Sequence, residues 1–290
     1  MEELRRQYNE LNPGIYLYPC ILKRETFFLD DDLGSVEAIF FYPNEYEYQE
    51  YEHNEFPIIY FIHGGGWCFG GEDVDHKLPR ELCNKTKSIV VYPLYSLSPE
   101  AKYPIAVKQC YKILCRVEEN AHKYRIDFNS LVVGGDSAGG NLAITTSLLC
   151  KMKNGPKIKK QILINPVTDT NLNTNSYLEF QEGFHLTKQQ MAWFFNQYLE
   201  NENQKNEIFV APNKATIEQL ANLPETLFLV GEFDVLKDEG LEFCEKLKKA
   251  NVKVNSIVFP GAIHDFIMYK FLNNTNCCKE GTATIIGFIC

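Results

Sequence analysis

Residues 131–143 place one serine among glycines, at the junction of two patterns that predict different secondary structure. The apolar run at 131–133 is typical of a buried strand, and apolar residues at helical spacing follow from residue 142. Gly135, Ser137 and Gly139 fit the G-x-S-x-G pattern, in which small flanking residues let strand and helix approach so closely that the serine is pushed out of the turn. A helix start here offers free N–H groups and a positive dipole end. The stretch therefore predicts a strand, a sharp turn and a helix, with Ser137 as a nucleophile whose reaction generates an oxyanion.

The rest of the chain alternates between strand-like and helix-like patterns. Its 290 residues suit one large α/β domain, which we expect to span 1–290. Continuous apolar runs predict strands covered on both faces, at 56–62, 89–92, 131–133, 162–164, 226–231 and 254–259. A hairpin is predicted from 26–29 and 36–42, and helical segments are predicted at 187–199 and 265–271. The alternation predicts an α/β fold with a mostly parallel sheet and helices on both faces.

Composition limits the classes of partner. The chain carries 29 basic and 38 acidic residues, a net charge of −9, and no long basic run, which disfavours nucleic acid and anionic membranes as partners. No apolar stretch has the length of a membrane span, and the N-terminal residues lack the apolar core of a signal peptide. We therefore expect a cytoplasmic protein without stable membrane insertion. The ten cysteines are scattered without metal-type CxxC pairs, which predicts reduced thiols and no metal site.

A serine hydroxyl is a weak nucleophile, so it needs a base within reach and a third group that fixes the base. His264 is the favoured base because it follows the strand predicted at 254–259, at the edge where parallel sheets place their ligands. The other histidines considered lie in polar loops, at a charged helix end or in the irregular segment 170–210, and they are His53, His76, His122 and His185.

Asp234 is the favoured acid because it too follows a predicted strand. Asp169, which follows the preceding strand, is the alternative. Asp234 also suits the N-terminal end of the helix predicted after it, so spacing alone leaves both interpretations open. Asp238 lies one turn later and is expected to be a helix-start residue.

Three consecutive glycines follow the strand predicted at 56–62, in the run His63-Gly64-Gly65-Gly66-Trp67. Glycines let main-chain N–H groups turn inward, and this pattern is the HGGG-type oxyanion element. We expect the N–H groups of Gly65, Gly66 and Ala138 to converge on the carbonyl oxygen of a bound ester. A flexible loop is the alternative, whereas a phosphate loop is disfavoured because the lysine and hydroxyl of a Walker motif are missing. His63 is expected to tie the loop rather than to act as a second base.

Taken together, these motifs resemble those of the hormone-sensitive-lipase-like esterases, a family of α/β-hydrolases. The run at 63–67 is similar to the family's oxyanion motif, and Gly135-Asp136-Ser137-Ala138-Gly139-Gly140-Asn141 is similar to its nucleophile elbow. Residues 95–104 and 234–240 resemble its Tyr-x-Leu-Ala-Pro-Glu and Asp-Pro-Leu-Arg-Asp-Glu-Gly segments, the second of which supplies the triad acid. The order Ser137, Asp234, His264 is also the family's order.

Three departures from the family pattern stand out. Asp265 occupies the glycine position of the family's His-Gly-Phe, Val235 replaces a proline, and Ser98 replaces an alanine. None of them removes a reacting group. Asp265 is adjacent to the proposed base, so we expect it either to raise the pKa of His264 or to point to solvent.

The resemblance implies an α/β-hydrolase fold with a small helical cap built from about 1–25 and 170–210. It also implies a serine esterase that cleaves short- to medium-chain acyl esters through an acyl-enzyme, with no cofactor and with a small-molecule ester as substrate. The sequence does not determine the oligomeric state, and a homodimer is the assembly to test. Amide hydrolysis or deacetylation uses the same groups and is the first alternative. The second is a non-catalytic receptor, as in the gibberellin receptors, which resemble the family but have lost the triad histidine.

Overall fold

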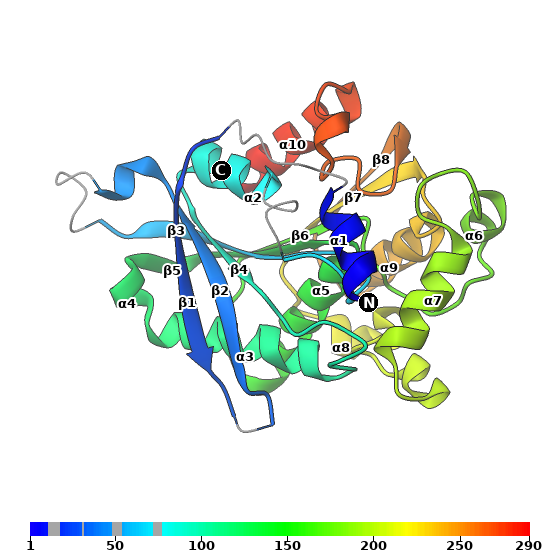
Figure 1. The fold of residues 1–290 in the computed structure, drawn as a ribbon, viewed down its shortest axis with the longest axis horizontal. Coiled ribbons are helices and arrows are strands. Elements are labelled where there is room, and N and C mark those ends of the chain that lie inside the picture. The colour runs from blue at the N-terminus through cyan, green and yellow to red at the C-terminus, as the bar shows by residue number, and fades with distance from the viewer. Residues whose placement is uncertain (11–17, 31, 48–53, 72–76) are drawn as a thin grey trace.

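The structure, a computed structural model, describes residues 1–10, 18–30, 32–47, 54–71 and 77–290. An eight-stranded sheet runs through its centre in the order β1-β2-β4-β3-β5-β6-β7-β8 (Figure 1). The strands are β1 Ile21–Phe28, β2 Ser35–Tyr42, β3 Phe56–Ile62, β4 Ile89–Pro93, β5 Ile126–Asp136, β6 Lys160–Ile164, β7 Glu225–Phe233 and β8 Val254–Ile263. β2 pairs antiparallel with β1 and β4, and the remaining neighbours pair parallel. The predicted mostly parallel sheet is confirmed.

Helices cover both faces of this sheet (Figure 1). On one face, side chains of α2 Lys77–Thr86 and α10 Asn276–Ile289 join one hydrophobic cluster with the strands. On the other face, α3 Ile105–Glu119, α5 Ser137–Lys153 and α9 Lys237–Lys249 join a second and larger cluster. The remaining α-helices are α1 Glu2–Glu10, α4 Ala121–Tyr124, α6 Asn175–Glu179, α7 Lys188–Tyr198 and α8 Ile217–Leu220.

The continuous apolar runs follow from this layering. In β3, Ile59 and Phe61 belong to the cluster with α2, whereas Ile58 and Tyr60 belong to the cluster on the opposite face. Successive side chains of a strand point to opposite faces, so a strand covered on both sides needs apolar residues at every position. The pattern at 56–62 therefore reports burial on both sides.

Several predicted strands are longer in the structure: β5 begins at Ile126 rather than at residue 131, and β8 ends at Ile263 rather than at residue 259. β1 begins at Ile21 rather than at residue 26, because it is an edge strand whose Lys23 and Arg24 are exposed and give no apolar run. The helix predicted at 265–271 is wrong. Asp265 adopts a left-handed φ of 56°, and turns lead into the short 3₁₀ helix Lys270–Leu272.

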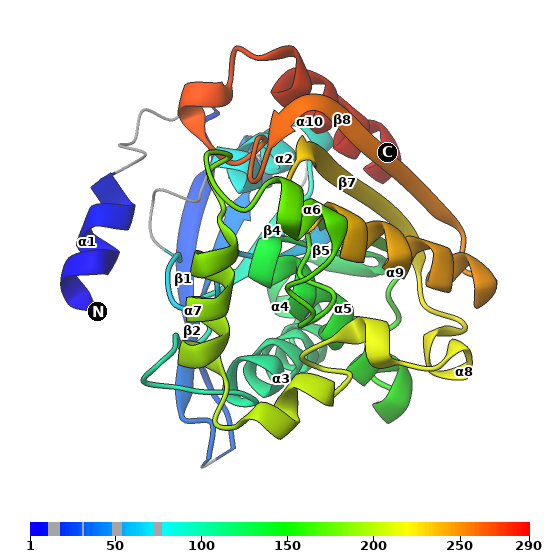
Figure 2. The same cartoon turned by 90° about the vertical axis from the view of Figure 1, so that its right-hand side faces the viewer.

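Residues 170–210 leave the strand–helix alternation, as expected. They contain α6, the predicted helix at 187–199, observed as α7, and the 3₁₀ helix Glu202–Asn206. Figure 2 shows α7 on the side of the molecule that faces the viewer, between α1 and α9. Phe69, in the loop after β3, stacks on Tyr8 of α1 at a ring-centroid distance of 5.4 Å and on Trp193 of α7 at 6.0 Å. Within the described ranges, each helix is too short or too polar to cross a bilayer.

Candidate active site

Ser137 stands at the junction of β5 and α5 in a strained conformation. Its φ of 53° lies in the left-handed region, which costs about 1–3 kcal/mol for a residue other than glycine. Flanking glycines permit the close approach. A Cβ on Gly139 would lie 2.1 Å from the carbonyl oxygen of Ile62, and one on Gly135 would lie 2.4 Å from that of Gly139. The strand, turn and helix predicted around Ser137 are confirmed.

Three side chains from different strand ends form one hydrogen-bonded line. Nε2 of His264, just after β8, lies 3.0 Å from Oγ of Ser137, and its Nδ1 lies 2.8 Å from Oδ2 of Asp234, just after β7. The side chains of His264 and Asp234 are only 4% and 0% exposed. The line therefore lies out of contact with bulk solvent, where its hydrogen bonds are strongest.

Both oxygens of Asp234 have partners that fix the carboxylate. Oδ1 accepts a 2.9 Å hydrogen bond from the backbone N–H of Leu236 in the turn before α9. Oδ2 accepts from the side-chain amide of Asn165, which follows β6, and also faces His264. The two interpretations left open by the sequence are therefore compatible, because one oxygen holds the turn and the other holds the imidazole.

The other sequence candidates lie elsewhere. Asp169 forms an ion pair with Lys214 at 3.2 Å. His122 is exposed in α4, and Nε2 of His185 lies 3.0 Å from the hydroxyl of Tyr269. His53 and His76 lie outside the described residues. Asp238 lies in the first turn of α9, as expected of a helix-start residue, and its side chain accepts a hydrogen bond from the backbone N–H of Ser176 in α6.

The charge balance around His264 favours the imidazolium. Burial lowers the pKa of His264, but the carboxylates of Asp234 and Asp265 outweigh it and raise that pKa to about 9. Asp265 Oδ1 lies 3.5 Å from Nε2, the same nitrogen that faces Ser137. The side chain of Asp265 is only 12% exposed, so the geometry supports the expectation that Asp265 raises the pKa of His264 rather than the expectation that it points to solvent.

The glycine loop after β3 is bound to the elbow. The N–H of Gly64 donates to Oδ1 of Asp136 at 3.1 Å, and the hydroxyl of Tyr95 donates to the carbonyl of His63 at 2.9 Å. The His63 ring stacks on Tyr95 at 4.2 Å, so its contacts are those of a residue that ties the loop. Gly65 and Gly66 have φ values of 92° and 59°, which favour glycine.

Trp67 anchors the other end of the same loop. Its fully buried ring stacks on Tyr198 of α7 at 4.2 Å, and its carbonyl accepts from the N–H of Ser98 at 2.8 Å. A Cβ on Gly66 would lie 2.2 Å from the Phe194 ring, which also belongs to α7. The loop is therefore packed between the elbow and the 170–210 segment.

A cavity of about 150 Å³ opens onto these groups. Ser137 and His264 line it together with Gly65 and Gly66 of the glycine loop. The remaining lining residues come from α1, the glycine loop, the 170–210 segment and the turn after β8, and they are Tyr8, Phe69, His185, Leu186, Gln190, Phe194, Asp265 and Tyr269. The cavity is thus mainly apolar and aromatic, with its polar groups gathered at the reacting end.

The comparisons with known proteins agree on one family. A model of the α/β-hydrolase fold matches residues 59–268. The vegetative-specific protein H5 of Dictyostelium discoideum is 38% identical over 276 residues, which cover 93% of this chain and 81% of that protein. The chain belongs to the α/β-hydrolase family that contains the hormone-sensitive-lipase-like esterases.

Other members of this α/β-hydrolase family are named as esterases. The carboxylic ester hydrolase LipN of Mycobacterium tuberculosis is 34% identical over 220 residues, covering 73% of this chain and 57% of that protein. The solved structure of the thermostable carboxylesterase EstE1, from a metagenomic library, matches with a TM-score of 0.90 at 30% identity, over 99% of this chain and 96% of that one. The solved structure of a thermostable esterase from Pseudomonas putida matches with a TM-score of 0.91 at 30% identity, over 99% of this chain and 87% of that one. The expected α/β-hydrolase fold is confirmed.

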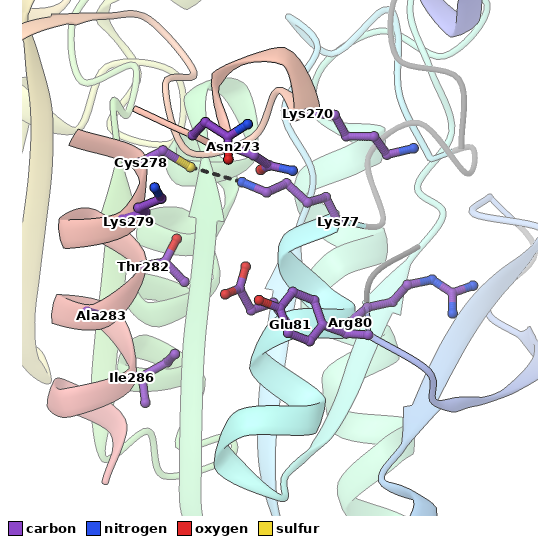
Figure 3. A pocket seen from close by; sticks show the side chains of 12 residues that line it. Lys77, Arg80, Glu81, Lys270, Asn273, Cys278, Lys279, Thr282, Ala283 and Ile286 are labelled. Carbon is purple, nitrogen blue, oxygen red and sulfur yellow. Dashed lines mark hydrogen bonds between the residues drawn. The ribbon is translucent and has the colours of Figure 1, made fainter. Parts of the chain in front are cut away.

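A larger cavity, of about 340 Å³, lies between α2 and α10 (Figure 3). Its lining includes the buried Lys77, whose ammonium donates to the carbonyl of Ile267 at 2.5 Å and to Sγ of Cys278 at 3.1 Å. Its described lining contains none of the residues predicted for the site, so size alone does not locate the chemistry. Across the portion of the chain that the structure describes, groups of three or more metal-ligating side chains are absent.

Sequence reasoning assigned no role to Asn165. It is fully buried with a left-handed φ of 44°, and it holds Asp234 from the end of the neighbouring strand. The available signal was its position directly after an apolar strand, the same signal that pointed to Asp234 and His264.

Proposed function

We propose that this protein is a serine carboxylesterase that cleaves short- to medium-chain acyl esters. The observation that carries the proposal is the hydrogen-bonded line from Asp234 through His264 to Ser137, at the end of a cavity lined by Gly65 and Gly66. The names of the related esterases support carboxylic esters as the substrate class.

In this mechanism, Oγ of Ser137 attacks the ester carbonyl while Nε2 of His264 accepts its proton. The N–H groups of Gly65, Gly66 and Ala138 stabilise the oxyanion. His264 then returns the proton to the leaving alcohol, which leaves an acyl group on Ser137. Water attacks this acyl-enzyme with the help of His264, and the acid leaves. Asp234 fixes the ring and stabilises the imidazolium in both halves of the reaction.

We also propose one catalytic domain over 1–290, with a cap from about 1–25 and 170–210. Two contacts support the cap. Arg5 of α1 donates to the carbonyls of Cys68 and Ser98, both at 3.0 Å, and Phe194 of α7 packs on Gly66. Both cap elements line the cavity, so they would set the length of acyl chain that fits. Residues 11–17 of this cap lie outside the described residues.

Two further predictions concern the cellular location and the oligomeric state of the protein. All ten cysteines are described and form no disulfide, which supports the proposed cytoplasmic location because reducing compartments keep thiols free. The homodimer stays a prediction, and sedimentation of the purified protein tests it.

A fluorophosphonate probe tests the proposed nucleophile. Wild-type protein is expected to be labelled, and Ser137→Ala is expected to lose both the label and the hydrolysis of p-nitrophenyl esters. Ser147→Ala is the matched control, because Ser147 is a buried hydroxyl on the same helix with partners outside the site. Equal labelling of wild type and Ser137→Ala would refute the assignment.

Amide hydrolysis is the alternative activity, since it uses the same groups with a different leaving atom. Turnover of matched p-nitrophenyl acetate and p-nitroacetanilide separates the two activities. A non-catalytic receptor is disfavoured, because the histidine whose loss marks such receptors is present as His264 and lies 3.0 Å from the serine.

A further inference from the structure

A carboxylate oxygen without a hydrogen-bond partner lies beside the reacting atoms. Oδ1 of Asp265 is buried and accepts no hydrogen bond, although it is 3.5 Å from Nε2 of His264. Leaving a buried acceptor unmatched costs about 1–3 kcal/mol, and more for a charged group. The residue also has a left-handed φ of 56°, which favours glycine. The side chain is thus an unfavourable addition to the fold at a position that faces the substrate cavity.

Aromatic rings surround the space that this carboxylate faces. Tyr8, Phe69, Phe194 and Tyr269 line the same cavity as Asp265. Tyr8 stacks on Phe69 at 5.4 Å, and Phe194 meets Phe69 edge to face at 5.9 Å. Faces of aromatic rings attract cations, and rings grouped around a cavity are a recurring way to bind quaternary ammonium groups.

The described lining of this cavity includes neither lysine nor arginine. Besides Asp265, the side chains in this lining that ionise at neutral or acidic pH are His185 and His264. Burial lowers the pKa of His185 and outweighs the carboxylate of Asp265, which favours the uncharged form of this ring. His264 is the one described cation close to Asp265, and it must lose its proton before it acts as the base.

We propose that this cavity selects esters whose alcohol part carries an ammonium group close to the scissile bond, with Asp265 as the counter-ion and the aromatic rings as the walls. The inference rests on the proposed ester hydrolysis and specifies its substrate class. The leaving oxygen must approach Nε2 of His264 to receive its proton, and Asp265 Oδ1 lies 3.5 Å from that nitrogen. A cation two carbons from the leaving oxygen, as in a choline ester, therefore falls within reach of the carboxylate. An anionic group at the same place would be repelled.

The test compares two substrates of the same shape, acetylthiocholine and its uncharged carbon isostere 3,3-dimethylbutyl thioacetate. Thiol release gives kcat/KM for both with wild type, Asp265→Asn and Asp265→Gly. We expect wild type to prefer the cationic ester, and we expect both variants to lower the cationic-to-neutral ratio by about tenfold or more. The ratio cancels any change in His264 that affects both esters alike. Glu10→Gln removes an exposed charge of α1 outside the cavity, and it should leave the ratio unchanged.

The outcomes separate this inference from the proposed function. If wild type hydrolyses p-nitrophenyl acetate but shows no preference for the cationic thioester, the substrate class is wrong and the esterase stands. A preference that persists in Asp265→Asn and Asp265→Gly, both folded by circular dichroism, also overturns the inference. Equal changes in kcat/KM for both thioesters in these variants would also overturn the inference, because Asp265 would then act through His264 alone. If wild type hydrolyses no ester and resists the fluorophosphonate probe, both proposals fail.

Discussion

Removing the charge of Asp265 is expected to move the pH dependence of ester hydrolysis to lower pH. The base must be uncharged to accept the serine proton, so kcat/KM for a neutral ester rises with pH as free His264 loses its proton. Burial lowers the pKa of His264, and the carboxylates of Asp234 and Asp265 raise it to about 9. Asp265→Asn keeps the shape of the side chain and removes one of the two charges.

The separation of 3.5 Å sets the size of the effect. At an effective dielectric constant of about 20, two unit charges at this distance attract by about 5 kcal/mol, which is an upper bound for this pair. An opposite charge at such range typically changes a pKa by about 1–3 units. With a pKa of about 9, about 1% of His264 is uncharged at pH 7. A decrease of one unit raises this fraction, and with it kcat/KM at pH 7, by about tenfold.

The measurement is kcat/KM for an uncharged p-nitrophenyl ester between about pH 6 and about pH 10. Asp265→Gly should shift the profile in the same direction, and it excludes a new hydrogen bond from asparagine as the cause. Glu10→Gln should leave the profile in place, since this glutamate is exposed and paired with Arg6. If both Asp265 variants had the same dependence of kcat/KM on pH as wild type, Asp265 would not control the protonation of His264.

Three other substitutions test the remaining parts of the site. Gly66→Ala places a Cβ 2.2 Å from the Phe194 ring and strains a φ of 59°, so kcat should fall by about 10²–10³ while the fold, followed by circular dichroism, persists. Asn165→Ala removes the amide that holds Asp234; kcat should fall by about tenfold at unchanged KM, and an unchanged kcat would refute the role. Arg5→Ala removes the contacts of α1 with the carbonyls of Cys68 and Ser98. KM for longer acyl esters should rise severalfold while kcat for the acetate ester stays constant, and equal effects on both esters would contradict the cap.

The geometry of the candidate site was predictable where it requires a local sequence pattern. The elbow needs glycines on both sides of Ser137, because the carbonyl of Ile62 and the backbone of residue 139 leave no room for a Cβ. His264 and Asp234 were predictable because each follows an apolar strand, and parallel strands bring such ends to one edge. Asn165 carries the same signal, but an amide has many roles in proteins, so position alone did not assign one.

Other features depend on neighbours that the sequence does not place. β1 pairs with β2 along its length although Lys23, Arg24 and Thr26 are polar and exposed, and this pairing leaves no continuous apolar run in the edge strand. The helix expected at 265–271 is not formed, because its first residue, Asp265, has a left-handed φ of 56° directly after His264, which contacts Ser137. Sequence periodicity indicates which residues are buried. The conformations of β1 and of residues 265–271 depend instead on strand pairing and on the surroundings of the candidate site.

The two roles inferred for Asp265 are linked, because one carboxylate cannot fully serve two cations. In the free enzyme, Asp265 favours the imidazolium of His264, from 3.5 Å away. An ammonium group bound against Asp265 offsets its charge and adds a positive charge near the ring, and both effects disfavour the protonated base. The cationic ester that the site selects would therefore also release the proton that blocks its own reaction. The pH profile of kcat reports the apparent pKa of the substrate-bound enzyme, and that of kcat/KM reports the apparent pKa of the free enzyme. For the cationic ester, the apparent pKa from kcat should therefore be lower than that from kcat/KM. For the uncharged isostere, the two values should coincide.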